Sequence, residues 1–207
     1  MTELATPGRL PQQARSRKRV ESILEASRAL ILEQGATALK MSDIAARADI
    51  PIGSLYQYFP TRTSIIASLY REYLSSGRDI AHQCLDSVTT RTQCERALRV
   101  FVHKMHEFNR AGTVMRDVFR AVAAERAIHD IYQKEHDFYC QILFETALRA
   151  RSTLPLRVLR IRATLVYKLW LGTMDVATEI DKPAADEYVN ESIELGLRII
   201  GITDRKI

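Results

Sequence analysis

The side chains best suited to binding chemistry lie in one short run, residues 53–60, which reads GSLYQYFP. Two residues with almost no side chain, Gly53 and Ser54, open the run, so the surface of a partner could approach the backbone closely there. Larger hydrogen-bonding groups follow at Tyr56, Gln57 and Tyr58. A Leu and a Phe at i, i+4 spacing would anchor a helix through its apolar face, which leaves the hydrogen-bonding groups pointing outward.

A helix, a tight turn and a second helix are predicted for residues 41–60. A narrow apolar stripe marks the first helix at Ile44, Ala45 and Ala48. Asp49 suits the corner of the turn because Asp tolerates a left-handed backbone, and Pro51 is placed to open the next helix. A helix that starts with small residues and continues with Gln and Tyr suits the major groove of DNA, with Gly53 and Ser54 near base edges and tyrosine hydroxyls on phosphates. A helical hairpin with packed aromatic residues is the alternative for the bare pattern.

The residues around this turn resemble those of the tetracycline-repressor (TetR) family of bacterial one-component regulators. The matching features are the Ile44–Ala45 pair, the turn at Asp49–Ile50, the run at 53–60 and a preceding helix that ends in Glu33-Gln34-Gly35. The resemblance extends over roughly residues 15 to 75. It implies an N-terminal helix-turn-helix that binds DNA, a dimer, and a small molecule that changes the fit of the dimer to its operator.

Two positions depart from the pattern of this family. A threonine is common in the family where Lys40 stands, and a serine or threonine where Pro51 stands, each capping a helix and contacting phosphate. Lys40 retains a cation for the phosphate but cannot cap, and Pro51 can do neither. Arg62 stands where the family usually has a phosphate-binding lysine, so that role transfers in kind. Thr61 is expected to cap the helix that follows, with Ser64 in place of the usual acid.

Basic residues near the N-terminus favour the same interpretation. Residues 1–20 carry Arg9, Arg15, Arg17, Lys18 and Arg19 against a single acid, Glu3. We expect a mobile leader at 1–14 and a helix from about Arg15 to Gly35, so the cations would stand at the helix start, the unfavourable end of the helix dipole. That placement favours contact with phosphates or a minor groove over a solvated basic tail. The predicted DNA contacts are Arg17, Lys18, Lys40, Ser42, Ile52, Gly53, Ser54, Tyr56, Gln57, Tyr58 and Arg62.

The composition predicts an all-α globular protein. The chain has 207 residues, of which 46% are apolar and 27% charged, with few Gly and Pro and no clear strand-like alternation. No apolar run approaches the ~18 residues of a membrane span, and no signal-peptide pattern opens the chain, so a cytoplasmic location is predicted. Three cysteines without CxxC spacing fit reduced thiols. The predicted organisation is the leader at 1–14, a helix-turn-helix DNA-binding domain at 15–60, a connecting helix at 61–79 and a ligand-binding and dimerisation domain at 80–207.

The last two predicted helices, from Pro155 to about Ile180 and from about Ala184 to Gly201, are each apolar on two sides. One side can pack within the domain, and the other needs a partner. We predict a two-fold dimer with a four-helix interface. Its residues are Val158, Leu165, Leu169, Gly172, Val176, Leu195 and Ile199. Two helices at the centre of a monomer are the alternative.

An apolar or amphipathic effector is predicted to bind among the C-terminal helices. The residues that would line its pocket are Phe101, Met105, Phe119, Glu135, Phe138, Tyr139, Ile142 and Trp170. Each of the aromatic residues is, taken alone, equally compatible with a packed core. Glu135 interrupts an apolar stripe, which makes it either a polar contact to the ligand or, as we expect, one half of an ion pair. The candidate partners are Arg99, Arg116 and Arg120.

Signatures of enzymes are missing: the sequence has no Gly-rich phosphate loop, no GxSxG elbow and no HExxH. His103 and His106 share a helix face at i, i+3, a weak pattern for a metal, and we predict no metal or other cofactor. The predicted function is a dimeric, ligand-responsive repressor of transcription that binds an inverted-repeat operator. A DNA-binding architectural protein without an effector, and a helical-bundle enzyme or metal-binding protein, are the alternatives.

Overall fold

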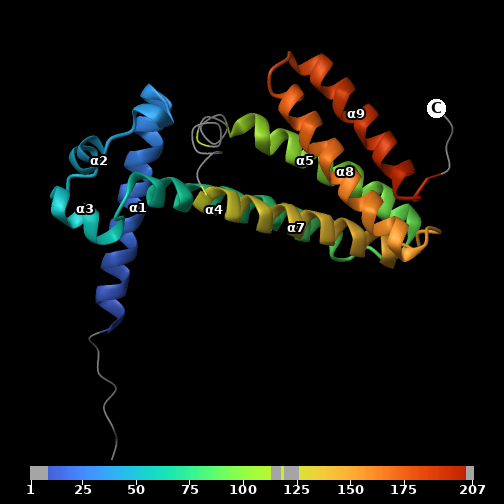
Figure 1. The fold of residues 1–207 in the computed structure, drawn as a ribbon, viewed down its shortest axis with the longest axis horizontal. Helices are drawn as coiled ribbons and strands as arrows, with labels where there is room; N and C mark the ends of the chain where they lie inside the picture. Colours follow the sequence, from blue (N-terminus) through green and yellow to red (C-terminus); the bar gives the residue numbers. More distant parts are fainter. Residues whose placement is uncertain (1–8, 113–117, 119–125, 204–207) are drawn as a thin grey trace, which may run out of the picture. The chain divides into compact units, whose positions relative to one another are not determined.

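The computed structural model describes residues 9–112, 118 and 126–203 of the chain (Figure 1). Within those ranges the secondary structure is helical throughout, which confirms the predicted all-α class. The elements are α1 (Arg9–Gln34), η1 (Ala36–Ala38), α2 (Met41–Arg47), α3 (Ile52–Tyr58), α4 (Arg62–Leu85), α5 (Arg91–Ala111), α7 (Arg126–Arg149), α8 (Leu156–Ala177) and α9 (Lys182–Ile199). The chain divides into two compact units, Met1–Glu72 with Val114–Ile128, and Tyr73–Thr113 with His129–Ile207. The domain boundaries expected from the sequence stay a prediction.

Helix α1 begins at Arg9, so the prediction of a helix start at about Arg15 is wrong. Pro11 falls in the first turn, where backbone N–H groups have no acceptor within the helix and a proline is therefore tolerated. Residues 9–14 of the expected leader are helical, and residues 1–8 lie outside the described part of the chain.

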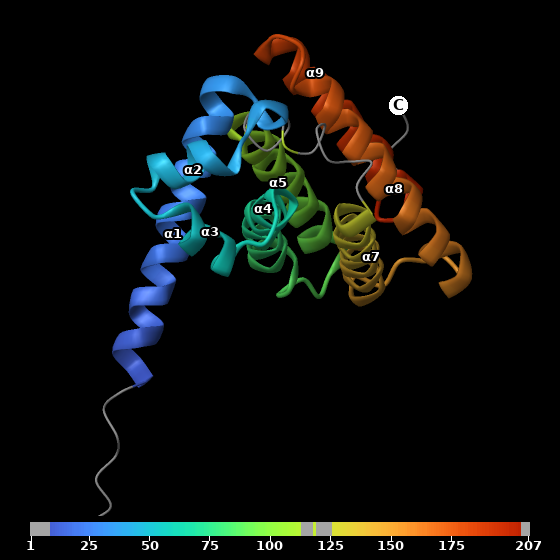
Figure 2. The ribbon, with the colours of Figure 1, turned by 60° about the vertical axis from the view of Figure 1, so that its left-hand side comes forward.

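The core of the first unit is formed by α1, α2, α3 and the start of α4. Figure 2 shows α2 and α3 lying beside α1. Its large buried side chains include Ile23, Leu24, Leu30, Ile31, Ile44, Leu55, Phe59, Ile65, Ile66 and Leu69. Gly35 ends α1 with a positive φ of 80°, and its N–H donates to the Ile31 carbonyl at 2.9 Å. The predicted C-cap is therefore confirmed.

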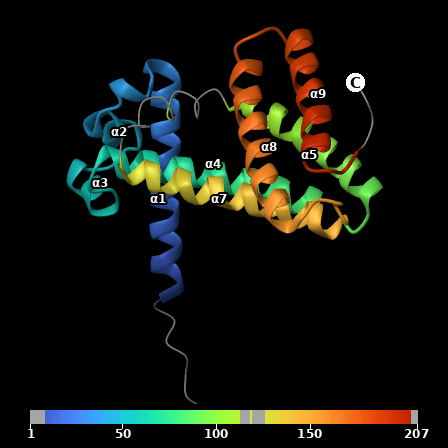
Figure 3. The same cartoon turned by 45° about the vertical axis from the view of Figure 1, so that its right-hand side comes forward.

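In the second unit, α8 and α9 run side by side (Figure 3). Trp170 of α8 is 4% exposed, and its Nε1–H donates to the Ser192 carbonyl of α9 at 2.9 Å. Asp181 caps α9 by accepting from the Ala184 N–H at 3.1 Å. Helices α5 and α7 contribute further side chains to the same core, among them Leu98, Phe101, Val102, Tyr139, Ile142, Leu143 and Phe144.

Arginine side chains satisfy carbonyl groups at several helix ends of this unit. The pairs are Arg91 with Gly201, Arg110 with Ala177, Arg149 with Leu85 and Arg162 with Ile199, at N···O distances of 2.9 to 3.1 Å. The last carbonyls of a helix have no N–H donor within the helix itself. A guanidinium group that donates to them therefore stabilises the helix end.

Among the described residues, no helix combines the length and the apolar character needed to cross a membrane. Cys84, Cys94 and Cys140 are free thiols, as predicted. Burial raises the pKa of Cys94 to about 12, so this thiol stays protonated and unreactive at neutral pH.

Candidate nucleic-acid interface

Helix α3 has one buried face and one open face. Leu55 is fully buried and Phe59, just beyond the helix, is 6% exposed, so this pair anchors α3 as predicted. On the other face Tyr56 is 49% exposed, and Gln57 is also exposed. A Cβ added at Gly53 would meet no atom within 4 Å. The open face therefore offers hydrogen-bonding groups, next to a stretch of backbone that a flat partner could approach.

The turn between α2 and α3 is held by backbone geometry that only a few residue types accept. Asp49 has a positive φ of 52°, as predicted for the corner of the turn. The N–H of Ile50 donates to the Ala45 carbonyl at 3.0 Å, which closes the turn. Pro51 is the N-cap of α3 rather than its first helical residue, and its carbonyl accepts from the N–H of Ser54 at 2.9 Å. The predicted entry to α3 is thus displaced by one residue.

The starts of α2 and α3 lack side-chain caps, as expected from the two departures from the family pattern. Lys40 is the N-cap of α2 and makes no side-chain hydrogen bond to the helix, which leaves its exposed cation directed to the surface. Pro51 likewise makes none at α3. Ser42 donates its hydroxyl hydrogen to the Asp43 carboxylate at 3.0 Å. The exposed donors at the first turn of α2 are therefore Lys40 and backbone groups.

The start of α4 is capped as the sequence predicts. The Ser64 N–H donates to the Thr61 hydroxyl at 3.1 Å, and the Thr61 N–H donates to the Ser64 hydroxyl at 3.3 Å, a reciprocal capping pair. Arg62, the first residue of α4, donates from Nη1 to the Thr37 carbonyl at 3.0 Å. Arg62 therefore has a structural role that sequence reasoning missed, and its contact with phosphate stays a prediction.

The basic residues of α1 lie on its exposed surface but not at its start. Arg17 and Lys18 are both exposed. Because α1 begins at Arg9, they stand more than one turn inside the helix, where the dipole at the helix end no longer acts on them. The prediction that these cations stand at the start of the helix is therefore wrong. The contact of Arg17 and Lys18 with DNA stays a prediction.

The residues predicted to line an effector pocket fall into the core of the second unit. Phe101, Tyr139, Ile142 and Trp170 are each buried in one apolar cluster, with Met105 and Phe138 packed against it. Tyr139 stacks on Tyr167 at a centroid distance of 5.5 Å. Phe119 lies outside the described residues. The structure brings these side chains together, and their role in binding an effector stays a prediction.

Glu135 forms the expected ion pair, but with Arg78 of α4. Arg78 Nε lies 2.7 Å from Glu135 Oε2, and Nη2 lies 2.5 Å from the same oxygen. Glu135 is 3% exposed, and its other oxygen, Oε1, is buried without a hydrogen-bond partner among the described residues. Burial raises the pKa of Glu135, and the hydrogen bond and charge of Arg78 oppose that rise.

Of the predicted arginine partners of Glu135, Arg99 was wrong, because it pairs with Glu194 at 2.5 Å and with Glu95 at 3.0 Å. Arg116 and Arg120 lie outside the described residues. Arg78 could be noted in the sequence as a basic residue of the predicted connecting helix. It could not be paired with Glu135 from the sequence, because the pairing depends on α4 lying beside α7.

One face of α8 and α9 is apolar and uncovered in the single chain. Leu165 of α8 is 55% exposed, Val176 is 43% exposed, and Leu195 of α9 is 39% exposed. The predicted interface residues Val158, Leu169 and Ile199 are half-buried, and Gly172 is exposed with no atom within 4 Å of an added Cβ. The opposite stripe, with Val166, Trp170, Val189, Ile193 and Leu197, is buried in the unit's own core. The predicted assignment of one core stripe and one outer stripe agrees with this burial.

Comparison with known proteins relates the helix-turn-helix region to one family. The model for bacterial regulatory proteins of the tetR family matches residues 23–69, which run from α1 through the turn and α3 into α4. This part of the chain is therefore a TetR-type DNA-binding region. The match confirms the predicted class, a DNA-binding regulator of transcription.

The relatives with curated descriptions match over a short stretch, and the chain spans under a third of their length. The HTH-type transcriptional repressor KstR of Mycolicibacterium smegmatis is 40% identical over 58 residues, which cover 28% of this chain and 28% of that protein. KstR of Rhodococcus jostii is also 40% identical over 58 residues, 28% of this chain and 27% of its own.

Solved TetR structures match the fold over most of the chain. SCO4454, a TetR-family transcriptional regulator from Streptomyces coelicolor, has a TM-score of 0.71 at 14% identity and covers 89% of this chain and 97% of its own. The SmeT–triclosan complex has a TM-score of 0.65 at 17% identity, covering 92% of this chain and 96% of that one. At these identities the likeness concerns the fold, and it extends the TetR architecture to the C-terminal helices.

Proposed function

We propose that this protein is a homodimeric repressor of transcription that reads an inverted-repeat operator through α3 and releases it when a small apolar or amphipathic molecule binds the second unit. The observation that carries the DNA-reading part is the open face of α3, where Gly53 leaves the backbone accessible while Leu55 anchors the helix. The expected location is the cytoplasm, where the operator is.

Base and phosphate contacts divide between two sets of residues. Gly53, Ser54 and Gln57 would face base edges, because they lie on the first turns of α3 away from its buried side. Tyr56, Tyr58, Lys40 and Arg62 would hold phosphates, with Ser42 and Ile52 close to the same surface. Arg17 and Lys18 would add cations from α1. Repression rather than activation follows the relatives, since KstR is named a repressor.

The proposal of a dimer rests on the uncovered apolar face of α8 and α9. Exposed Leu165 and Leu195 on neighbouring helices form part of one stripe that a second copy could cover. A dimer with two-fold symmetry would place two copies of α3 on two half-sites, which is why the operator is expected to be an inverted repeat.

The proposal of an effector rests on the buried aromatic cluster and on Glu135. Oε1 of Glu135 is a buried acceptor without a described hydrogen-bond donor, and Phe138, on the same helix, packs against the aromatic cluster. SmeT, which shares the fold, was solved with triclosan, a small molecule. A ligand that prefers one arrangement of the dimer would weaken operator binding about 5- to 150-fold, the usual range of allosteric coupling.

Selection from a library of random DNA duplexes tests the DNA-reading function. The full-length protein is expected to enrich duplexes that carry an inverted repeat, and binding to them should weaken steeply as salt rises. The Gln57→Ala variant should enrich the same repeat with one relaxed position in each half-site. Equal recovery of all sequences would instead identify an architectural DNA-binding protein.

The effector proposal has its own experiment. Operator binding is titrated in the presence of a library of apolar compounds, for the wild type and for Glu135→Gln. A compound that weakens wild-type binding and has a shifted effect on the variant supports a pocket at Glu135. A library without any active compound, or one whose compounds act on both proteins alike, would argue against this pocket.

A further inference from the structure

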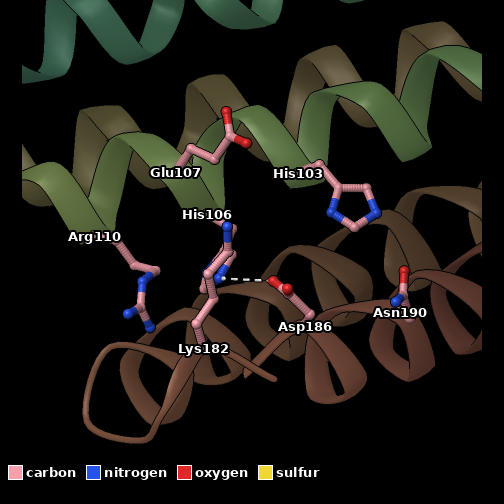
Figure 4. A pocket seen from close by; sticks show the side chains of 7 residues that line it. All are labelled: His103, His106, Glu107, Arg110, Lys182, Asp186 and Asn190. Carbon is pink, nitrogen blue, oxygen red and sulfur yellow. Dashed lines mark ion pairs between the residues drawn. The ribbon is translucent and has the colours of Figure 1, made fainter. Parts of the chain in front are cut away.

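A polar cleft lies between α5 and α9, apart from the buried aromatic cluster. It has a volume of about 540 Å³, within the range of small-molecule sites. Its lining residues are His103, His106, Glu107, Arg110, Lys182, Asp186 and Asn190 (Figure 4). All seven belong to the second unit, and none was predicted to line the effector pocket.

His106 is a buried residue of the cleft whose ring lacks a hydrogen bond to any described residue. Its side chain is 2% exposed because it continues the buried stripe of α5 that includes Leu98 and Val102 at four-residue spacing. Within the part of the chain that the structure describes, neither ring nitrogen has a hydrogen-bond partner. The nearest carboxylate oxygen, Asp186 Oδ1, lies 3.7 Å from Nε2, too far for a direct hydrogen bond. A buried imidazole without hydrogen bonds lowers the stability of the folded protein. Such a group needs an explanation, and a ligand that supplies the missing hydrogen bonds is one.

The lining of the cleft carries two cations, Arg110 and Lys182, together with two carboxylates, Glu107 and Asp186. Arg110 is held in place by donating from Nη1 to the Ala177 carbonyl at 3.1 Å, which leaves other guanidinium N–H groups for a ligand. Lys182 is the first residue of α9, where the helix dipole adds to its positive charge. No described residue forms an ion pair with Lys182. Two cations and the N-terminus of α9 thus border the cleft.

The interior of the cleft offers both donors and acceptors. Asp186 points toward His106 in Figure 4, and Asn190 lies one turn further along α9. Burial, followed by the charge of Arg110, lowers the pKa of His106, while Asp186 and Glu107 act in the opposite direction and His103 adds to the lowering. A neutral imidazole has one N–H donor and one acceptor nitrogen, a pair that matches a hydroxyl or an amino group.

A metal is a poor fit for this cleft, since the described residues contain no group of three or more His, Cys, Asp and Glu that could hold one. A single water between His106 and Asp186 would satisfy the histidine alone, without engaging Lys182 or the remaining N–H groups of Arg110. A carboxylic acid that carries a second polar group could contact the two cations with its carboxylate and His106 with the second group.

We propose that the cleft between α5 and α9 binds a small carboxylic acid with a hydroxyl or amino group beside the carboxylate. The carboxylate lies between Lys182 and Arg110, and the neighbouring hydroxyl or amino group lies between His106 and Asp186. The site is separate from the proposed effector pocket and does not depend on DNA binding. Because it joins α5 to α9, its occupancy would stabilise the second unit directly.

The experiment is a binding titration of the full chain with a panel of 2-hydroxy and 2-amino carboxylates, each paired with its methyl ester. The readouts are the NMR signals of the His106 ring and the midpoint of thermal unfolding. At least one acid is expected to shift both, and its uncharged ester is expected to shift neither. Lys182→Ala should weaken binding of that acid by about tenfold, the effect of losing one charge-assisted contact. Lys104→Ala, an exposed lysine of α5 outside the cleft, is the matched control and should bind normally.

His106→Phe separates a ligand site from a structural histidine. In the proposed site, the apolar ring raises the unfolding midpoint of the free protein and abolishes its response to the acid. A variant that unfolds at a lower temperature, together with a wild type that no acid of the panel stabilises at millimolar concentration, would show that His106 is satisfied by water and that the proposal is wrong. Equal binding of acid and ester would overturn it as well.

Discussion

Gly196 of α9 lies directly against the indole ring of Trp170 of α8: a Cβ built on Gly196 would stand 2.7 Å from Trp170 Cζ2. The same indole donates its N–H to the Ser192 carbonyl, one turn earlier in α9. The absence of a side chain at Gly196 is therefore what allows the two helices to share this ring. Gly172 of α8, by contrast, has open space around it within one chain.

Gly196→Ala is expected to lower the free energy of unfolding by about 1–3 kcal/mol, the usual cost of overpacking a core. The reason is that the ring cannot move away without losing its hydrogen bond. Chemical denaturation followed by circular dichroism measures the effect. The double variant Gly196→Ala/Trp170→Phe should be less destabilised than the sum of the two single changes, since a smaller ring makes room for the methyl group. Strict additivity would show that the two residues do not compete for space.

Changes on α3 should separate base contacts from phosphate contacts. Gln57→Ala is expected to relax sequence preference by about 1–3 kcal/mol at one position of each half-site. Lys40→Ala should weaken binding to every sequence alike and reduce the salt slope by about 1. Titrations of a selected operator at several salt concentrations provide the measurement. Arg71→Ala, an exposed cation of α4 away from this face, serves as the control and should change neither quantity. If Lys40→Ala leaves the salt slope unchanged, Lys40 does not contact phosphate.

A charge placed on the uncovered face of α8 should separate the subunits. Leu165→Glu, at a position 55% exposed in the single chain, is expected to yield a folded monomer because only the dimer would bury the carboxylate. Sedimentation at micromolar concentration measures the assembly, and circular dichroism verifies that the helices persist. Leu32→Glu on α1, where the leucine is 65% exposed, is the matched control and should remain dimeric. A wild-type protein that sediments as a monomer would remove the basis for the interface.

The buried imidazole of His106 should make the protein sensitive to mild acid. Its pKa is lowered in the folded state, so below the unfolded value of 6.5 the unfolded chain binds a proton that the folded chain does not. Stability is therefore expected to fall as pH drops below about 6.5. The difference in unfolding midpoint between the wild type and His106→Phe should widen over that range. His129→Gln, a change at an exposed histidine of α7, should follow the wild type at every pH.

Removing the partner of Glu135 should cost more than neutralising Glu135 itself. Arg78→Ala leaves a buried carboxylate without its only described hydrogen bonds, and we expect a loss of about 1–3 kcal/mol. Glu135→Gln keeps an oxygen that can accept from Arg78 and removes the buried charge, so its loss should be smaller. Urea unfolding of the two variants at neutral pH compares them. An equal loss in both would mean that the charge of Glu135 contributes nothing beyond its hydrogen bonds.

Local patterns were enough to predict the recognition helix, because each of its features depends on a few neighbouring residues. The i, i+4 spacing of Leu55 and Phe59 determines which face packs, and Asp49 needs only its own backbone preference to form the turn. The prediction of where α1 starts was wrong for a local reason. A proline breaks the interior of a helix, but Pro11 lies in the first turn, where a proline is tolerated.

Contacts between distant helices could not be predicted in the same way. Arg78 and Glu135 are 57 residues apart, and their pairing depends on the register of α4 against α7. The cleft at His106 likewise requires α9 to pass over one particular turn of α5. Sequence periodicity places each residue on a face, but it leaves open which other helix that face meets.

The four arginines that reach carbonyl groups at helix ends have a consequence for how the second unit responds to solvents. A guanidinium group stays protonated throughout the pH range in which histidines and carboxylates titrate. These arginine-to-carbonyl hydrogen bonds therefore keep their strength in acid and in mild alkali. Guanidinium chloride, by contrast, supplies a free ion with the same planar set of donors, which can occupy those carbonyls in place of Arg91 or Arg149. Urea carries no such charge. These four arginine contacts should therefore tolerate a change of pH better than they tolerate guanidinium chloride.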